Sequence, residues 1–176
     1  LARQEVLKGI YFLGIVDLPW PKSGMGFDGF TFHLPMTFVK QIPRNRFDSM
    51  LKKITGRSTD FYLKKYLKIP RRIHYSKIIR EAFKNIPFQC NHYPGIIPNW
   101  DNTPRSREDG IVFYGETGKL FREHIQQAMK IIKDRESDKR IIFIKSWNEW
   151  AEGNYLEPNS KLCLTLLNSI HKEVVY

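Results

Sequence analysis

Two glutamates, Glu149 and Glu152, stand three residues apart in a segment rich in aromatic residues, directly after an apolar run. Chemistry at a glycosidic bond needs one group that protonates the oxygen and a second, differently charged group that assists at the sugar ring, and paired carboxyl groups can supply both. Trp147, Trp150 and Tyr155 would offer flat apolar surfaces to the C–H face of a pyranose. The segment therefore predicts a saccharide site.

A structural alternative fits the same residues. Glutamate in the first turn of a helix interacts favourably with the helix dipole, and tryptophan often only packs. A Glu-x-x-Glu pair has no specificity by itself, so the spacing leaves catalysis and this alternative about equal. If the chain turns helically here, Glu149 and Glu152 share one face with Cβ atoms about 5–6 Å apart. Repulsion would then leave one carboxyl protonated and the other ionised, as acid/base catalysis requires.

Further candidates for contacts with sugar hydroxyls are Trp100, Asp101, Arg105, Asn148, Glu157 and His92. For Asp101 and Arg105 the alternative is a structural ion pair that braces their loop. Glu157 has an alternative role as an acceptor of backbone hydrogen bonds at the end of its loop. His92 follows an expected strand, where a site residue is plausible, although a lone histidine is more often a core residue.

The sequence gives no indication of a metal or another cofactor. The remaining histidines have no ligand spacing to another His or Cys; they are His33, His74, His124 and His171. Cys90 and Cys163 also form no metal-binding motif. We expect both to be buried free thiols, which mildly favours a reducing compartment.

The glutamates need an element that positions them, and the apolar residues 141–146 predict a strand immediately before them. An apolar strand of this kind is typical of a parallel sheet covered on both faces, and such sheets form their sites at the carboxyl ends of the strands. Further strands are expected at 8–17, 29–35 and 86–92, and helices at 75–83 and 120–132. Strands that alternate with helices favour parallel βα units, here in a single domain piece covering 1–176.

Two segments resemble the WbsX-like glycosyltransferase family, whose members carry a domain similar to glycoside hydrolase family 99. The first is WNEWAEGNYLEP at 147–158, and the second is YPGIIPNWDNTPR at 93–105. A weaker match, GFDG at 26–29, precedes them in the same order. The resemblance extends over most of the chain from about residue 9 and is loose between 37 and 84.

This resemblance implies a (β/α)8 barrel of the TIM type and a chain roughly twice as long. Such barrels need about 250 residues, so we expect the 176 residues to be a fragment, the carboxyl-terminal half of a barrel. By motif position, Glu149 would be the base that deprotonates the sugar 2-hydroxyl. Glu152 would be the acid/base that protonates the leaving oxygen. Lys145 departs from the family pattern, which usually has a small or amide residue there.

The net charge of +11 is unevenly distributed, because most of the excess falls between Lys40 and Arg80, where Asp48 and Asp60 are the only acids. This 40–80 segment could meet a phosphorylated sugar donor, a lipid-linked acceptor, anionic headgroups at a membrane surface, or nucleic acid. A solvated basic face is an equally weighted alternative. Nucleic acid is a minority alternative because the sequence has none of its binding motifs.

The composition, 41% hydrophobic and 27% charged, indicates an ordered domain and excludes a disordered tail. Apolar runs are too short to cross a bilayer and no secretory signal is seen, so we expect a cytoplasmic location, peripheral to the inner face of the membrane. The expected function is glycosyl transfer in surface-polysaccharide biosynthesis of the O-antigen or lipopolysaccharide type. The alternatives are a retaining endo-acting glycoside hydrolase resembling a mannosidase, a non-catalytic sugar-binding module, or a basic nucleic-acid binder.

Overall fold

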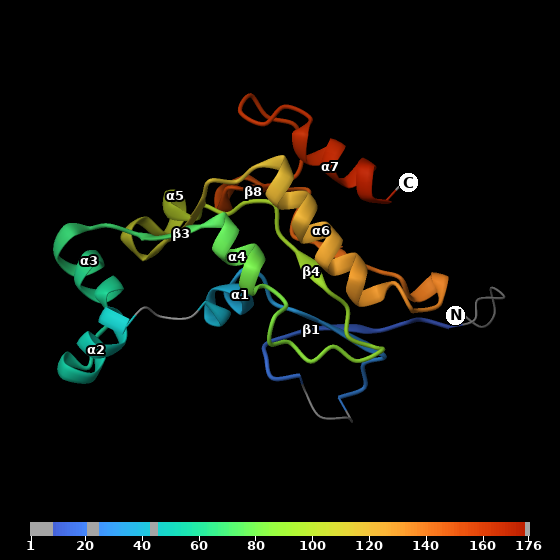
Figure 1. Cartoon of the computed structure of the whole chain (residues 1–176), viewed down its shortest axis with the longest axis horizontal. Coiled ribbons are helices and arrows are strands. Elements are labelled where there is room, and N and C mark those ends of the chain that lie inside the picture. Colours follow the sequence, from blue (N-terminus) through green and yellow to red (C-terminus); the bar gives the residue numbers. More distant parts are fainter. Residues whose placement is uncertain (1–8, 21–24, 43–45, 175–176) are drawn as a thin grey trace.

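The computed structural model describes residues 9–20, 25–42 and 46–174 and shows a mixed α/β fold (Figure 1). Its strands are β1 (Leu13–Val16), β2 (Gly29–Phe32), β3 (Arg71–His74), β4 (Gly95–Ile96), β5 (Ile111–Tyr114), β6 (Phe143–Ile144), β7 (Asn148–Glu149) and β8 (Asn154–Tyr155). Its helices are α1 (Met36–Gln41), α2 (Arg46–Thr55), α3 (Thr59–Leu67), α4 (Tyr75–Glu81), α5 (Thr103–Ser106), α6 (Gly118–Ile132) and α7 (Thr165–Val174). The 3₁₀ turns are η1 (Arg107–Asp109), η2 (Ser137–Lys139) and η3 (Trp150–Glu152).

Four parallel segments lie side by side and share one direction. Strand β1 pairs with β2 in the register Leu13↔Gly29, and β4 pairs with β6 in the register Gly95↔Phe143. A parallel bridge between Phe30 and His92 connects β2 to the segment that continues into β4. The carboxyl ends of β1, β2, β4 and β6 therefore meet at one edge, as expected for parallel βα units.

The expected strands are shorter in the structure than in the sequence analysis. Residues 29–35 form a strand only over β2, and the part of 8–17 that is described forms one only over β1. The expected strand at 86–92 is wrong, because this segment is irregular apart from the bridge at His92. The strand at 141–146 is reduced to β6, and its expected burial on both faces is wrong, since Phe143 and Ile144 are both exposed at the edge of the parallel set.

The two helices expected from apolar periodicity are confirmed as α4 and α6. The side chain of Thr117 caps α6 by accepting a hydrogen bond from the backbone N of Leu120 at 3.2 Å. The buried stripe of α6 includes Phe121, Ile125 and Ala128, and it packs against β4 and α7. A second core cluster lies beneath α1 and α4 and supports the segment that leads into β4.

The two cysteines are exposed, so the expectation of buried thiols is wrong. Cys90 lies in the irregular segment where a strand was expected. Cys163 lies in the turn before α7 and has a positive φ of 48°. Both side chains therefore belong to surface turns and not to the core.

Residues 46–67 of the basic 40–80 segment form two helices. Helices α2 and α3 lie together at one end of the molecule, away from α6 and α7 (Figure 1). They lead into β3, which pairs in parallel with β5 to form a small second sheet. Among the described residues, no helix has both the length and the apolar character needed to cross a bilayer.

Candidate functional site

The two glutamates lie in and beside a short hairpin that follows the carboxyl end of β6. Strand β7 pairs antiparallel with β8, with Asn148 opposite Tyr155 and Glu149 opposite Asn154. Glu149 has extended backbone, whereas Glu152 ends the 3₁₀ turn η3 that connects the two strands. The conditional expectation that both glutamates share one face of a helix is therefore not met.

The hairpin requires glycine at its tip. Gly153 has a φ of +49°, and a Cβ atom there would lie 2.8 Å from the backbone oxygen of Asp101. The backbone N of Asp101 in turn donates a hydrogen bond to the backbone oxygen of Glu152 at 2.9 Å. The tip of the hairpin is thus packed directly against the loop that contains the predicted Trp100, Asp101 and Arg105.

One face of the hairpin presents aromatic surface to solvent. The rings of Trp150 and Tyr155 stack with centroids 4.2 Å apart. The Glu157 carboxylate accepts hydrogen bonds from Trp150 Nε1 at 2.8 Å and from Asn148 Nδ2 at 2.9 Å. Trp147 and Trp150 remain 55% and 51% exposed. All five of these side chains were predicted as site residues. The hydrogen bond to Glu157 fixes the orientation of the exposed Trp150 indole.

The opposite face attaches the hairpin to the parallel strands. The buried side chain of Asn154 donates hydrogen bonds from Nδ2 to the backbone oxygens of Asn99 at 2.8 Å and Lys145 at 2.9 Å. Asn99 Oδ1 accepts a hydrogen bond from the backbone N of Tyr155 at 2.8 Å. Because residues directly opposite in an antiparallel pair share a face, Glu149 projects on the same side as Asn154. Glu149 therefore faces the edge where β4 and β6 end.

Glu152 is held between two cations. Its side chain is 12% exposed, its Oε1 accepts a hydrogen bond from the Arg105 guanidinium, and its Oε2 lies 3.3 Å from Lys145 Nζ. Lys145 Nζ also lies 5.4 Å from the centre of the Trp100 ring. The two positive charges stabilise the carboxylate and fix its position.

The alternative of an ion pair between Asp101 and Arg105 is wrong. Asp101 Oδ1 instead accepts hydrogen bonds from the backbone N of Thr103 at 3.0 Å and from its hydroxyl at 2.6 Å, at the first residue of α5. Arg105, which lies in α5, extends to Glu152. The loop is thus braced through the hairpin and not through an ion pair of its own.

A cavity of about 280 Å³ adjoins this cluster at the carboxyl ends of the parallel strands. Its lining comes from β1, β2, β4 and β6 and the residues that follow them, among them Ile15, Thr31, His33, Gly95, Lys145 and Ser146. Lys145 belongs to both the cavity and the ion cluster, so the cavity and Glu152 are neighbours. This volume is slightly below the usual range for small-molecule sites, about 300–1,000 Å³.

The family pattern described as glycosyltransferase WbsX matches residues 1–170. The chain belongs to this family. Two uncharacterised WxcX proteins of Xanthomonas campestris pv. campestris, one from strain B100 and one from a second strain, are each 37% identical over 71 residues. These matches cover 40% of the chain but 10% of each relative.

A solved structure named "Glycoside hydrolase-like protein" resembles this WbsX family chain with a TM-score of 0.52. The match covers 97% of the chain and 46% of that structure at 14% sequence identity, so it concerns the fold alone. The chain thus spans a tenth of the curated relatives and under half of the solved structure.

Sequence reasoning did not identify Lys145 and His33 as site residues in this WbsX family member. Lys145 stood out only as a departure from the family pattern, although its place one residue after β6 is a signal for a side chain at the carboxyl edge. His33 directly follows β2 and lines the cavity. The same positional signal would have found it.

His92 lies apart from the hairpin. Its ring is buried and stacks on Trp20 with centroids 4.1 Å apart, and its Nδ1 accepts a hydrogen bond from the backbone N of Gln89. Burial lowers the pKa of His92 below its ordinary value, which favours the neutral ring. Its contacts are those of a core residue.

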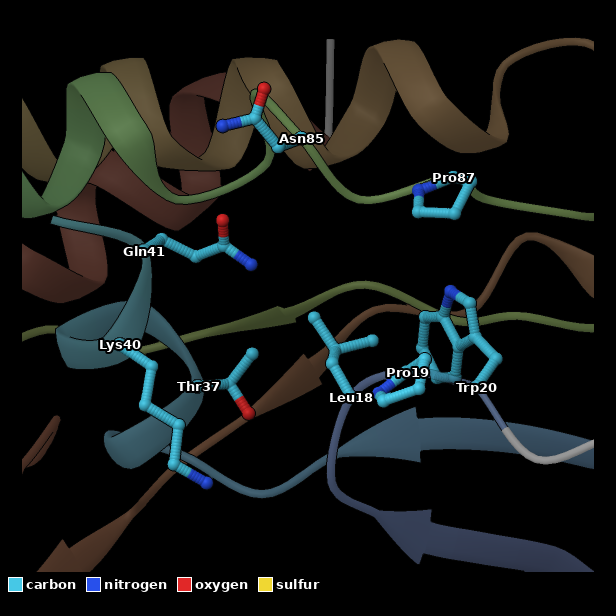
Figure 2. Close-up of a pocket in the computed structure, with 8 residues that line it drawn as sticks. All are labelled: Leu18, Pro19, Trp20, Thr37, Lys40, Gln41, Asn85 and Pro87. Carbon is cyan, nitrogen blue, oxygen red and sulfur yellow. The ribbon is translucent and has the colours of Figure 1, made fainter. Parts of the chain in front are cut away.

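A separate cavity of about 330 Å³ is lined by residues of α1 and by Trp20, the ring on which His92 stacks (Figure 2). Trp20 and Leu18 line one part of it, while the amides of Gln41 and Asn85 line another (Figure 2). Neither catalytic candidate contributes to this cavity. It is therefore distinct from the cavity that adjoins Lys145.

Proposed function

We propose that the chain forms part of a carbohydrate-active enzyme that transfers a glycosyl group during the assembly of a surface polysaccharide. The observation that carries the proposal is the β7–β8 hairpin. In a member of the WbsX family, it combines two glutamates with exposed indoles beside the carboxyl ends of parallel strands. Carboxyl pairs and flat aromatic surfaces are the groups that glycosyl chemistry uses.

The proposed fold of the whole enzyme is a (β/α)8 barrel in which residues 1–176 form one domain piece, the carboxyl-terminal half. The parallel order of β1, β2, β4 and β6 supports this, because it is the arrangement of consecutive barrel strands. Ile15 of β1 is 69% exposed although it lines the cavity, which supports further strands packing on that side. The likeness to less than half of a glycoside hydrolase-like structure also agrees with a half-barrel.

In the proposed reaction Glu149 accepts the proton of the sugar 2-hydroxyl, and the resulting oxygen attacks the anomeric carbon. The bond to the leaving oxygen breaks as Glu152 donates a proton to that oxygen. An acceptor alcohol then attacks the same carbon and gives its proton to Glu152, while the 2-oxygen regains its proton from Glu149. The configuration is retained because the anomeric carbon is attacked twice.

Glu152 gives a proton to the leaving oxygen in the first step, while its carboxyl oxygens contact Arg105 and Lys145. A donor that carries phosphate would attract these two cations to its own oxygens. The carboxyl oxygens of Glu152 would then be free to contact the leaving oxygen. This coupling favours a phosphorylated sugar donor over a neutral one.

A third cavity, close to the hairpin, supports the same donor class. It has a volume of about 450 Å³, and its charged lining consists of Lys68, Arg72 and Arg107 together with the acids Asp101 and Glu108, of which Glu108 is paired with Lys68. Asp101 is bonded through its backbone to Glu152. We assign this cavity to the phosphates of the donor or of a lipid-linked acceptor, with guanidinium groups as the anion ligands.

The proposed sugar contacts are the two exposed indoles, Trp147 and Trp150, and the polar groups of Asn148, Glu157 and Tyr155. Trp100 does not contact the sugar in this proposal. Its buried ring lies under Lys145 and positions that lysine. Arg105 acts at the anionic side of the substrate, while Asp101 orders the loop through its hydrogen bonds to Thr103. His92 is left out of the proposed site because its contacts belong to the core.

Retaining glycoside hydrolysis is the second candidate function. The name of the similar solved structure, a glycoside hydrolase-like protein, favours it, and the same two carboxyl groups would serve if water replaced the acceptor alcohol. Transfer and hydrolysis would differ in the acceptor molecule, alcohol or water, and not in the residues of the hairpin. An assay must therefore offer both acceptors.

Glu149→Gln and Glu152→Gln, made separately, test the proposal in assays with nucleotide sugars, lipid-linked acceptors and free oligosaccharides. Glu136→Gln, in the turn before β6, is the matched control. We expect both hairpin variants to lose turnover while the control keeps it. Release of free sugar without transfer would favour hydrolysis. Saccharide binding without any turnover in the wild type would instead indicate a non-catalytic module and would contradict the proposal.

A further inference from the structure

Helix α2 (Arg46–Thr55) exposes an apolar face that the proposed reaction does not use. Phe47, Met50 and Ile54 are 60%, 53% and 74% exposed. Their spacing places them on one face of the helix. Large exposed apolar patches on soluble domains generally mark interaction sites.

The orientation of this face is fixed by contacts on another side of α2. Asp48 is buried, and its Oδ1 accepts hydrogen bonds from the backbone N of Thr59 at 2.8 Å and from the Thr59 hydroxyl at 2.6 Å. These bonds attach α2 to the start of α3. Figure 1 shows that both helices lie at one end of the molecule, so α2 can approach a flat surface.

Basic residues surround the apolar face. Between 46 and 57 the sequence has four cations, Arg46, Lys52, Lys53 and Arg57, and Asp48 is the only acid. Arg46 and Lys53 lie four residues before and three residues after Met50, so they border the apolar face. Lys64 and Lys68 of the following helix segment are paired with Asp109 and Glu108. These acids therefore lie with α3 and do not neutralise the cations of α2.

We propose that α2 docks on an anionic membrane surface. Phe47, Met50 and Ile54 enter the boundary between headgroups and acyl chains, while the bordering arginine and lysine side chains bind anionic headgroups. A helix with one apolar face and a basic polar face lies in the membrane interface in this way. The inference is independent of the catalytic assignment, since it uses no residue of the β7–β8 hairpin.

Flotation of the full chain with vesicles tests the proposal. One vesicle type is pure phosphatidylcholine and the other contains phosphatidylglycerol as well. We expect binding to the anionic vesicles, and loss of binding as salt is raised. Lys53→Ala should weaken binding about fivefold, the factor expected for one basic residue at an anionic surface. Lys130→Ala, on the exposed side of α6, should leave it unchanged.

Two further variants test the contribution of the apolar side chains to vesicle binding. Phe47→Gln and Ile54→Gln keep a good helix former while removing the apolar side chain, and each should weaken binding about tenfold or more. Leu164→Gln, an exposed leucine before α7, is the control and should bind as the wild type does. Circular dichroism verifies that the variants are folded.

Three outcomes would overturn the proposal. The first is equal binding to neutral and anionic vesicles, and the second is binding that the α2 variants do not change. The third is an absence of vesicle binding together with self-association or RNA binding that Phe47→Gln removes. That result would assign the face to a protein or nucleic-acid partner.

Discussion

Two positively charged side chains contact the carboxylate of Glu152, whereas Glu149 lies outside this ion cluster. Arg105 and Lys145 come from different parts of the chain, α5 and the end of β6. The sequence shows all three residues but not their proximity, because the hairpin that brings them together depends on buried amide contacts of Asn99 and Asn154. The aromatic content of this segment and the spacing of its two glutamates could be read from the sequence.

Glu152→Gln should destabilise the fold by about 1 kcal/mol, because Arg105 and Lys145 would lose their carboxylate while their own partial exposure reduces the effect. Urea unfolding measures the change. Glu136→Gln removes a surface pair with Lys139 and should leave the midpoint unchanged. Equal shifts in both variants would contradict the idea that Glu152 is a structural anchor.

His124 makes stability depend on pH. It is fully buried, in contact with the rings of Phe38 and Phe83, and burial lowers the pKa of His124 to about 3. The unfolded chain binds a proton near pH 6.5 while the folded chain does not, so stability is fully present above that pH and falls as the pH decreases toward 3. The expected loss between pH 6.5 and pH 5 is about 2 kcal/mol.

Denaturant unfolding across this pH range, with His124→Leu, provides the measurement. The variant should lose the His124 part of the slope. His171→Gln changes an exposed histidine and should retain that slope. A wild-type stability that stays flat from pH 6.5 to pH 5 would show that His124 is not held neutral by burial.

At the scale of elements, long apolar periodicity was predictable and short strand pairing was not. Helix α6 follows directly from its buried stripe and its Thr117 cap. The run at 141–146 predicts a strand of six residues, but the structure pairs only Phe143 and Ile144. The strand expected at 86–92 is irregular, and β4 follows it at Gly95–Ile96, where no strand was predicted. Pairing and burial both depend on neighbours distant in sequence, so an apolar run alone determines neither the length of a strand nor the burial of its side chains.

The hairpin β7–β8 was not predicted from the sequence, because a helical turn was the only local geometry considered for the two glutamates. Its tip can be tested with two glycines that both have positive φ. Gly153→Ala would place a Cβ atom 2.8 Å from the Asp101 backbone oxygen, whereas a Cβ atom at Gly56 meets no atom within 4 Å. Gly56→Ala should cost about 1 kcal/mol for its backbone conformation, and Gly153→Ala clearly more.

Thermal unfolding of the two glycine variants separates backbone strain from crowding. Gly153→Ala should also reduce turnover, because the Glu152 backbone is bonded to the displaced Asp101 loop. Gly56→Ala should keep full turnover, since it ends the α2 region. Equal stability losses would show that the tip of the hairpin tolerates a side chain.

At the scale of the whole molecule, the parallel set of strands has outer edges at β1 and β6 within the described residues. Ile15 lines the cavity and is largely exposed. If further strands complete a barrel in the intact enzyme, Ile15 becomes an interior residue there. The sequence resemblance predicted this architecture, and no local pattern could have done so.

Ile15→Asp tests the barrel proposal. In the intact enzyme the buried charge should lower stability by about 3 kcal/mol or more. In residues 1–176 alone the same substitution should have little effect, because the side chain is exposed. Leu164→Asp is the control and should be tolerated in both. A tolerated Ile15→Asp in the intact enzyme would contradict a completed barrel.

The central claim is that the hairpin carboxylates perform glycosyl chemistry, and the kcat/KM of Glu149→Gln tests it most directly. Glu149 lies in β7, outside the ion cluster that anchors Glu152, so its loss should spare the fold while removing the base. We predict a decrease of about 10²–10⁴-fold with an unchanged unfolding midpoint. Turnover equal to that of the wild type, in a folded variant, would contradict the account.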